Sequence, residues 1–401
     1  MTRRDYGSGS IYYRAATDRW VGTVEAGWTP KGKRRRITIT AKTEAEAKRK
    51  LRDRIKELEA DGPVGANPRT TVKAWADEWL AVTERTLAPH TYTANRSAVR
   101  QWIVPTIGRA RLTDLAPADV RKVADAMRTA RKATSSIARV HSVLIKMLKD
   151  ARAEGHGVPA RVVEVKAPKS NASDRTDIPP ADAVKILRAA ANLPTGARWI
   201  AALLQGMRQG ECLGLTWEQV DLERRVLLLS WQLQPIPYRV PRDRTSGFRA
   251  PDGYDCRQVK GRMHLVRPKS RAGWRLIPLI EPMVAALEAR REAAPDGPAG
   301  LVWFDGDGPI DQKADDAEWY ALQDAAGVRH PSGRHYTVHE ARHSTASLLH
   351  AGGVAPETIT AIIGHSSWAS TRTYIHVDPE PMRKALEGVA ATLQLSPPSD
   401  G

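Results

Sequence analysis

The sequence predicts a multidomain α+β protein. We expect a small three-stranded sheet plus a helix, then a four-helix bundle, then a mainly helical domain with a small antiparallel sheet. Three observations support this order. The 401 residues exceed what one ordinary hydrophobic core accommodates. Two stretches that contain several prolines divide the chain, and the hydrophobic pattern alternates before the first of them but is helical after it.

Residues 1–62 carry three alternating apolar and polar runs, at 10–14, 20–28 and 34–40, which predict three antiparallel strands. Thr43 followed by Glu46 is a capping box and predicts a helix that closes the sheet and ends near Gly62. Residues 1–61 hold 16 Lys and Arg against 9 Asp and Glu, a balance of +7. We therefore expect a DNA-binding face, although a solvated surface with a chance basic excess is the alternative. The candidate DNA contacts here are Arg34, Arg35 and Arg36.

Residues 63–70 are turn-rich, and we interpret them as a linker. Residues 71–157 show a helical pattern, with Trp75 and Trp79 as core positions, and predict a four-helix module that contacts DNA phosphates. Its candidate contacts are Arg96, Arg100 and Arg139. Residues 158–178 include Pro159 and Pro168 and are followed by Pro179, so we expect a second, extended linker able to lie along a DNA backbone. Lys166 and Lys169 are its candidate contacts.

Residues 179–380 predict one further domain. Helical runs at 181–191 and 198–209 precede strand-like runs at 226–233, 264–266 and 274–279, and a helix is expected from Glu281 onward. Residues 234–261 are rich in Pro, Gly, Asp and Arg and predict a long surface loop. In the tail, 381–401, an amphipathic helix presents Met382, Leu386, Val389 and Leu393 on one side.

Composition narrows the class of partner. A net charge of +17 and a pI near 10.0 suit a large polyanion, and nucleic acid is the first candidate. No run of about 20 apolar residues predicts a membrane span, and the N-terminus lacks the apolar core of a secretory signal, so a cytoplasmic location is expected. Cys212 and Cys256 match no metal-ligand spacing and are interpreted as one buried thiol and one loop thiol.

Five short motifs in the last domain carry the chemistry. They are Gly206-Met-Arg208-Gln-Gly-Glu211, where we expect one helix to end near Gly210 and another to begin; Lys269 between two strand-like runs; His339-Glu-Ala-Arg342-His343; Gly364-His365-Ser-Ser367; and Tyr374, nine residues after His365. Their types and order resemble the tyrosine recombinase family, that is, phage integrases of the lambda type. The resemblance covers about residues 180–390, and the two preceding modules look like arm-binding and core-binding domains.

The motif spacing also makes chemical sense. His339 and Arg342 share one helix face, and a phosphodiester cleaved without a metal needs cations on the non-bridging oxygens and a proton donor at the leaving oxygen. Arg208 and Arg342 suit the first role because guanidinium groups bind phosphate bidentately. The resemblance implies the rest: Lys269, on a hairpin, protonates the leaving 5′ oxygen, His339 and His365 move protons and hold the phosphate, and Tyr374 is the nucleophile that becomes joined to the 3′ phosphate.

The resemblance also implies partners. These are double-stranded DNA with core-type and arm-type attachment sites and three further copies of the chain in a tetramer that passes through a Holliday junction, with no cofactor, metal or ATP. A DNA-bending host factor and an excisionase remain open, and the tail docks either on its own domain or on a neighbouring subunit.

Three alternatives compete with this interpretation. His339-Glu340-x-x-His343 matches a zinc-protease motif, but Ala346 and Leu349 stand where a metzincin needs Gly and His. A type IB topoisomerase shares the Tyr, Arg and Lys chemistry, but the N-terminal module and the C-terminal tail speak against it. A catalytically silent DNA-binding regulator is disfavoured because all six candidate catalytic positions are intact.

Overall fold

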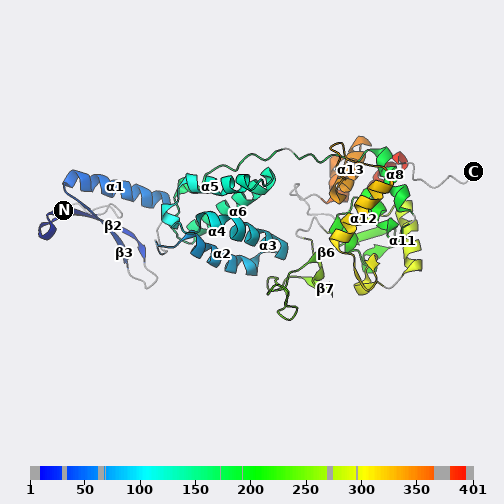
Figure 1. Cartoon of the computed structure of the whole chain (residues 1–401), viewed down its shortest axis with the longest axis horizontal. Coiled ribbons are helices and arrows are strands. Elements are labelled where there is room, and N and C mark those ends of the chain that lie inside the picture. Colours follow the sequence, from blue (N-terminus) through cyan, green and yellow to red (C-terminus); the bar gives the residue numbers. More distant parts are fainter. Residues whose placement is uncertain are drawn as a thin grey trace, which may run out of the picture. The chain divides into compact units, whose positions relative to one another are not determined.

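The computed structural model describes residues 10–28, 34–61, 67, 69–171, 173–191, 193–268, 274–294, 297–364 and 380–393 (Figure 1). The chain divides into two compact units. The first comprises Met1–Ala172 with Ala250–Asp252, and the second comprises Ser173–Arg249 with Gly253–Gly401. Each unit is described by itself.

The first unit begins with an antiparallel sheet of β1 (Ser10–Arg14), β2 (Arg19–Trp28) and β3 (Arg34–Ala41), in that order, followed by α1 (Glu44–Asp61). Val21 and Val24 of the central strand are buried, and Ala47 and Leu51 of α1 are buried with them. The Thr43 hydroxyl accepts a hydrogen bond from the Glu46 N–H at 3.2 Å, which satisfies one free donor at the start of α1. The predicted sheet and helix are confirmed.

A helical bundle follows in the same unit. Its helices are α2 (Val72–Thr86), α3 (Pro89–Ala98), α4 (Val104–Ile107), α5 (Pro117–Thr129) and α6 (Thr134–Ala153). A π-helical turn, Val99–Ile103, joins α3 to α4 just before Pro105, so these three pieces form one continuous helical stretch. With α2, α5 and α6 they make the predicted four-helix module. The indole N–H of Trp75 donates to the Met147 carbonyl at 2.8 Å, which satisfies the polar atom of a buried core side chain.

The start of segment 158–178 differs from the extended linker that we expected. Residues Ala160–Val163 form one helical turn, α7, and Val158 and Val162 are fully buried in the bundle core. Apolar burial thus outweighs the neighbouring prolines at this end. Residues 164–171 contain no helix or strand, and Lys166 and Lys169 are exposed there.

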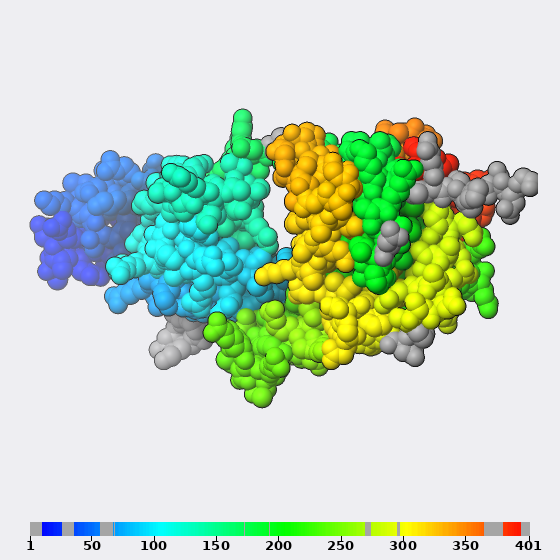
Figure 2. Space-filling view, turned by 45° about the vertical axis from the view of Figure 1, so that its right-hand side comes forward, coloured from blue at the N-terminus to red at the C-terminus, as the bar shows by residue number. Residues whose placement is uncertain are grey.

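The second unit is mainly helical. Its helices are α8 (Pro180–Ala190), α9 (Gly196–Leu203), α10 (Gln209–Leu213), α11 (Glu281–Ala293), α12 (Gln312–Ala325), α13 (Val338–Ala351), α14 (Pro356–Ile363) and α15 (Glu380–Thr392). They enclose one core in which Trp199 and Trp319 stack with ring centroids 4.8 Å apart. Helices α8 and α12 pack together, and Figure 2 shows their surfaces side by side in green and gold.

Three small antiparallel sheets complete this unit. Their strand orders are β4 (Val220–Asp221), β5 (Val226–Leu229), β9 (Arg275–Pro278); β6 (Gln232–Pro235), β8 (Met263–Val266), β7 (Cys256–Lys260); and β10 (Phe304–Asp305), β11 (Gly308–Pro309). The expected strand 226–233 is therefore two strands in different sheets. The Gln219 side-chain carbonyl explains the break, because it accepts the backbone N–H groups of Ser230 and Trp231 that a continuous ladder would use.

Two further expectations need correction as a result. The strands on either side of Lys269 are β8 and β9. Among the described residues β8 pairs with β6 and β7, and β9 pairs with β5, so the two strands do not form the expected simple hairpin. Residues 234–261 are not one loop, because β7 lies within them and pairs with β8. Cys256 is accordingly a strand residue, whereas Cys212 is buried as expected.

Helix α15 packs against the core of the second unit. Its side chains at Met382, Leu386 and Val389 are buried in the unit's core, and Arg383 donates to the Leu279 carbonyl at 2.9 Å. Residues 380–393 thus pack within their own chain here, and docking of the tail on a neighbouring subunit stays a prediction.

Candidate active site

Arg208 lies at the start of a short helix rather than at the end of a long one. Helix α9 ends at Leu203, and the chain reaches α10 through a turn in which Gly206 has a φ of +60°. This left-handed conformation favours glycine, and a Cβ at Gly206 would also displace the end of the Ile363 side chain. Arg208 is the extended N-cap of α10, and its side chain is 35% exposed. The expected helix through Gln209 is therefore wrong, but the arginine still projects from the turn.

Arg342 and His339 lie one turn apart on α13. The helix begins with a capping box, in which the Glu340 carboxylate accepts the Thr337 backbone N–H at 2.7 Å. Arg342 is only 3% exposed and donates to the carbonyls of Gly206 and Ile363. Burial, followed by the charges of Arg275 and Arg208, lowers the pKa of Arg342 from its usual value.

Two residues that the sequence analysis did not single out hold these arginines. Glu211, 2% exposed, accepts from the Arg208 side chain at 2.6 Å, and Arg275, 5% exposed, makes a bidentate pair with the same carboxylate at 2.9 and 2.8 Å. Burial raises the pKa of Glu211, but the pairs with Arg275, Arg208 and Arg342 outweigh it and bring that pKa down to about 2. The sequence signal for Glu211 was its position in the quoted motif, three residues after Arg208.

His339 is uncharged near neutral pH. Partial burial, then the neighbouring His343, then Arg175 and the two active-site arginines lower the pKa of His339 to about 4. The two imidazole rings are edge-to-face with centroids 4.6 Å apart. A neutral imidazole donates from one nitrogen and accepts at the other, so it can exchange a proton with an arriving group.

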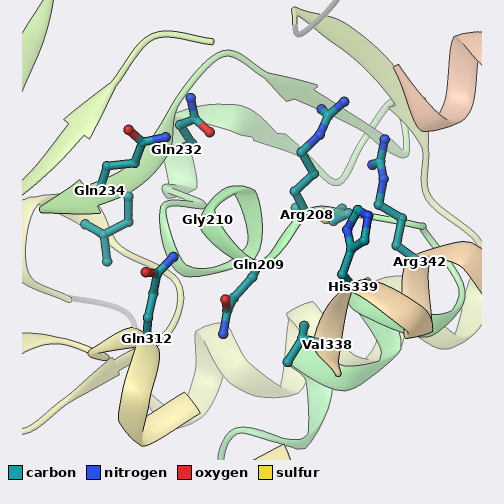
Figure 3. Close-up of a pocket in the computed structure, with 11 residues that line it drawn as sticks. Arg208, Gln209, Gly210, Gln232, Gln234, Gln312, Val338, His339 and Arg342 are labelled. Atoms are coloured by element: carbon teal, nitrogen blue, oxygen red, sulfur yellow. The ribbon is translucent and has the colours of Figure 1, made fainter. Parts of the chain in front are cut away.

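These side chains line one polar cavity of about 260 Å³. In Figure 3 the side chains of Arg208, Arg342 and His339 extend in the same direction from the Arg208 turn and from α13. Across the cavity from them Figure 3 shows the amide side chains of Gln232, Gln234 and Gln312, and the remaining lining residues are Met207, Gln209, Gly210, Leu233 and Val338. Two guanidinium groups beside a neutral imidazole suit a tetrahedral anion such as a phosphodiester.

Three of the predicted catalytic residues, Lys269, His365 and Tyr374, lie outside the described residues. The last described residue before His365 nevertheless lies at the site. Gly364, the residue before His365, closes α14 in a left-handed conformation and accepts from the Arg208 guanidinium at 2.6 Å. The structure therefore brings Arg208, His339 and Arg342 together and leaves the other three residues untested.

The predicted DNA contacts lie in the first unit. Arg36, Arg96, Arg100, Arg139, Lys166 and Lys169 are all exposed or partly exposed, whereas the side chains of Arg34 and Arg35 are outside the described set. Arg100 pairs with Asp77 at 2.9 Å and Arg36 approaches Glu25 at 3.8 Å. Exposed pairs of this kind are weak, so they leave both arginines available for a phosphate.

The contacts of Glu340 argue against the zinc-protease alternative. This carboxylate is fully buried and accepts from Arg334 at 2.7 and 2.9 Å, from Thr337, and from the Thr176 backbone at 3.2 Å. Its lone pairs are thus used to hold the helix start, Arg334 and the backbone of Thr176. Among the described residues, no group of three or more His, Cys, Asp and Glu side chains could hold a metal ion, and no helix is long and apolar enough to cross a membrane.

Comparison with known proteins identifies the family of the chain. The sequence pattern of the phage integrase family matches residues 178–380, and that of the phage integrase N-terminal SAM-like domain matches residues 71–127. An integrase of Streptomyces ambofaciens is 30% identical over 381 residues, which cover 92% of each chain. An integrase of Saccharopolyspora erythraea is 24% identical over 418 residues, which cover 94% of each chain.

Solved structures show the same fold. The Tn1549 transposon integrase in complex with transposon right end DNA matches with a TM-score of 0.61 at 18% identity, over 80% of this chain and 99% of the other. A lambda integrase dimer bound to a COC′ core site matches with a TM-score of 0.53 at 17% identity, over 94% and 99% of the two chains. Taken with the sequence matches, these results show that the chain belongs to the phage integrase family and is a tyrosine-type site-specific recombinase that acts on DNA.

Proposed function

We propose that the chain cuts and rejoins DNA at attachment sites through a covalent 3′-phosphotyrosine intermediate, with Tyr374 as the nucleophile. The Tyr374 hydroxyl oxygen attacks the phosphorus, the bond from phosphorus to the 5′ oxygen breaks, and Lys269 supplies the proton that this oxygen takes up. His339 and His365 hold the phosphate and move the tyrosine proton. The reverse attack by a 5′ hydroxyl restores the diester, so the bond energy is conserved without ATP.

The convergence of Arg208 and Arg342 on one cavity carries this proposal. A phosphodiester has one negative charge, and its pentacoordinate transition state has two. Each non-bridging oxygen can receive donors from one guanidinium group, and these groups are fixed before the substrate arrives. The two guanidinium groups thereby provide charge stabilisation that a metal ion supplies in other phosphoryl-transfer sites, so we propose cleavage that proceeds without one.

The other parts of the chain have proposed roles as well. Residues 1–62 bind arm-type sites, residues 71–157 bind the core site, residues 179–380 cut, and the segments 63–70 and 158–178 connect them; the tail is 381–401. We propose a homotetramer that resolves a Holliday junction, as a lambda integrase tetramer bound to such a junction supports. A host DNA-bending factor and an excisionase are proposed additional partners, and the cytoplasm of a bacterial host is the proposed compartment.

The test uses a library of nicked duplexes with randomised core sequence, incubated with the protein in EDTA. Cleavage beside the nick releases a short fragment and traps the covalent adduct, which is separated under denaturing conditions and sequenced. The wild type should form an adduct on a 3′ end, and Tyr374→Phe should bind the selected DNA but form none. An adduct with Tyr374→Phe, or no adduct with the wild type on any DNA, would contradict the proposal.

The same assay tests the phosphate contacts. Arg208→Ala or Arg342→Ala should slow adduct formation by a factor of about 10² to 10³ each, the usual cost of removing one preorganised donor from a transition state. Arg36→Ala, in the proposed arm-binding module, is the matched control and should cleave a core-only duplex at the wild-type rate. Cleavage near the wild-type rate in the Arg208→Ala and Arg342→Ala variants would remove the assignment.

A further inference from the structure

Glu211 presents an electrostatic problem for the proposed phosphate site. Its buried carboxylate lies 2.6 Å from the Arg208 guanidinium and 4.0 Å from that of Arg342, the two groups that should bind the phosphate. A carboxylate this close to both cations neutralises charge that the transition state needs, and in a buried site this effect is large. Something must therefore compensate Glu211.

Arg275 on β9 provides the compensation. Its two terminal nitrogens donate to the two Glu211 oxygens at 2.9 and 2.8 Å, and its Nε donates to the Ile362 carbonyl at 2.7 Å. Arg275 does not line the cavity. All three guanidinium nitrogens are thus used inside the protein, which distinguishes this side chain from a phosphate-binding arginine.

The lone pairs of Glu211 are saturated as a result. Oε1 accepts from the side chains of Arg208 and Arg275, and Oε2 accepts from the Arg208 backbone N–H at 2.8 Å and from Arg275. Glu211 therefore fixes the N-cap backbone of Arg208 while Arg275 balances its charge. Three guanidinium groups and one carboxylate leave a net charge of +2, which matches the two negative charges of a pentacoordinate phosphorus.

We propose that Arg275 is a positioning residue for strand cleavage: it neutralises Glu211, so that Glu211 orients Arg208 without cancelling the charge that Arg208 and Arg342 present to the phosphate. This inference rests on the proposed function and deepens it. Arg275 is not among the residues that line the cavity, so its effect should depend on the charge at position 211 and not on contact with DNA.

The test compares Arg275→Met with the double variant Arg275→Met/Glu211→Gln, on a nicked duplex that the wild type cleaves. Arg275→Met should slow cleavage about 10²-fold, because the uncompensated carboxylate then withdraws charge from Arg208. The double variant should recover about tenfold of that loss, because the amide introduced at position 211 still accepts the Arg208 backbone N–H but carries no charge. A double variant no faster than the single one would overturn the proposal.

Two further readouts separate charge compensation from a merely structural role. In Arg275→Met the ratio of wild-type to variant rate should shrink as the pH falls from about 7 to about 5, because protonation of Glu211 removes the uncompensated charge. Arg275→Lys keeps the positive charge beside Glu211, whereas Arg275→Met removes it. The lysine variant should therefore cleave faster than the methionine variant. A pH-independent ratio, or equal rates for the lysine and methionine variants, would contradict the proposal.

A matched control is Arg383→Met on α15. Arg383 also donates to a backbone carbonyl near β9, that of Leu279, but does not contact Glu211. This variant should cleave at the wild-type rate. If the wild type itself forms no adduct, the proposed function fails; if the wild type cleaves and Arg275→Met cleaves equally fast, only the role of Arg275 fails.

Discussion

Like charges around His339 make the charge state of this residue depend on the substrate. The pKa of about 4 in the free protein results from partial burial, from His343 and from nearby arginines. A phosphate placed among these cations would favour the protonated imidazole and raise the pKa. His339 is therefore suited to take up a proton after the DNA has bound.

The measurement is histidine NMR of the free protein and of Tyr374→Phe bound to a core duplex. His339 should titrate well below its usual pKa of about 6.5 in the free protein and shift upward in the complex, and His339→Asn identifies its signal. An unshifted or raised pKa in the free protein would contradict the geometry.

The same pKa has a consequence for stability. The unfolded chain binds a proton at His339 near pH 6.5, and the folded protein binds it only near pH 4. Folded-state stability should therefore decrease as the pH falls through this window, and His339→Asn should reduce the slope. Urea unfolding at several pH values measures it, and an unchanged slope in the variant would argue against the assignment.

The active-site residues could be predicted from the sequence more easily than the ion-pair partners that hold them. The motif spacing was enough to place Arg342 and His339 on one helix face, and to identify Arg208. It did not identify Arg275 as the partner of Glu211, because 64 residues separate them and the contact depends on how β9 packs against α10. A long-range ion pair has no periodic signature in a single sequence.

Among the elements, α9 and α12 are joined by an ion pair that is almost fully removed from water. Arg198 is fully buried, pairs with Asp315, and lies over the Trp199 ring at 3.5 Å. Asp315 also accepts from Gln209 at 2.7 Å, which connects α12 to the residue after Arg208. Breaking a buried pair costs more than the pair itself contributes, because one charge remains uncompensated.

Asp315→Leu should therefore lower the free energy of unfolding by about 3–5 kcal/mol. The double variant Arg198→Met/Asp315→Leu should lose less than the single variant, because no charge is left unpaired. Urea unfolding of the full chain measures both. Equal losses would mean that the cost reflects packing alone.

The boundaries of helices and strands were predicted well where the hydrophobic period stays constant along the element. They were predicted poorly where a remote side chain takes the backbone hydrogen bonds of a strand. The N-terminal strands and the bundle helices follow their patterns closely. The run 226–233 reads as one strand because every position is compatible with a sheet, and only the remote Gln219 divides it. The end of α9 at Leu203 depends similarly on the tertiary position of Gly206.

For the molecule as a whole, a net charge of +17 on 401 residues predicts binding that weakens steeply with salt, because each phosphate contact releases counterions. The N-terminal module contributes to this charge but contains none of the proposed catalytic residues. Deletion of residues 1–61 should therefore abolish recombination between full attachment sites while sparing cleavage of a core-only nicked duplex. Unchanged recombination would show the module to be dispensable.

The central claim is that Tyr374 forms the covalent bond to DNA, and peptide mapping of the trapped adduct tests it most directly. After nuclease and trypsin digestion of the wild-type adduct, mass spectrometry should find the nucleotide remnant on the peptide from Thr373 to Arg383, with fragment ions that place it on Tyr374. A remnant on any other residue, with the peptide from Thr373 to Arg383 unmodified, would contradict the account.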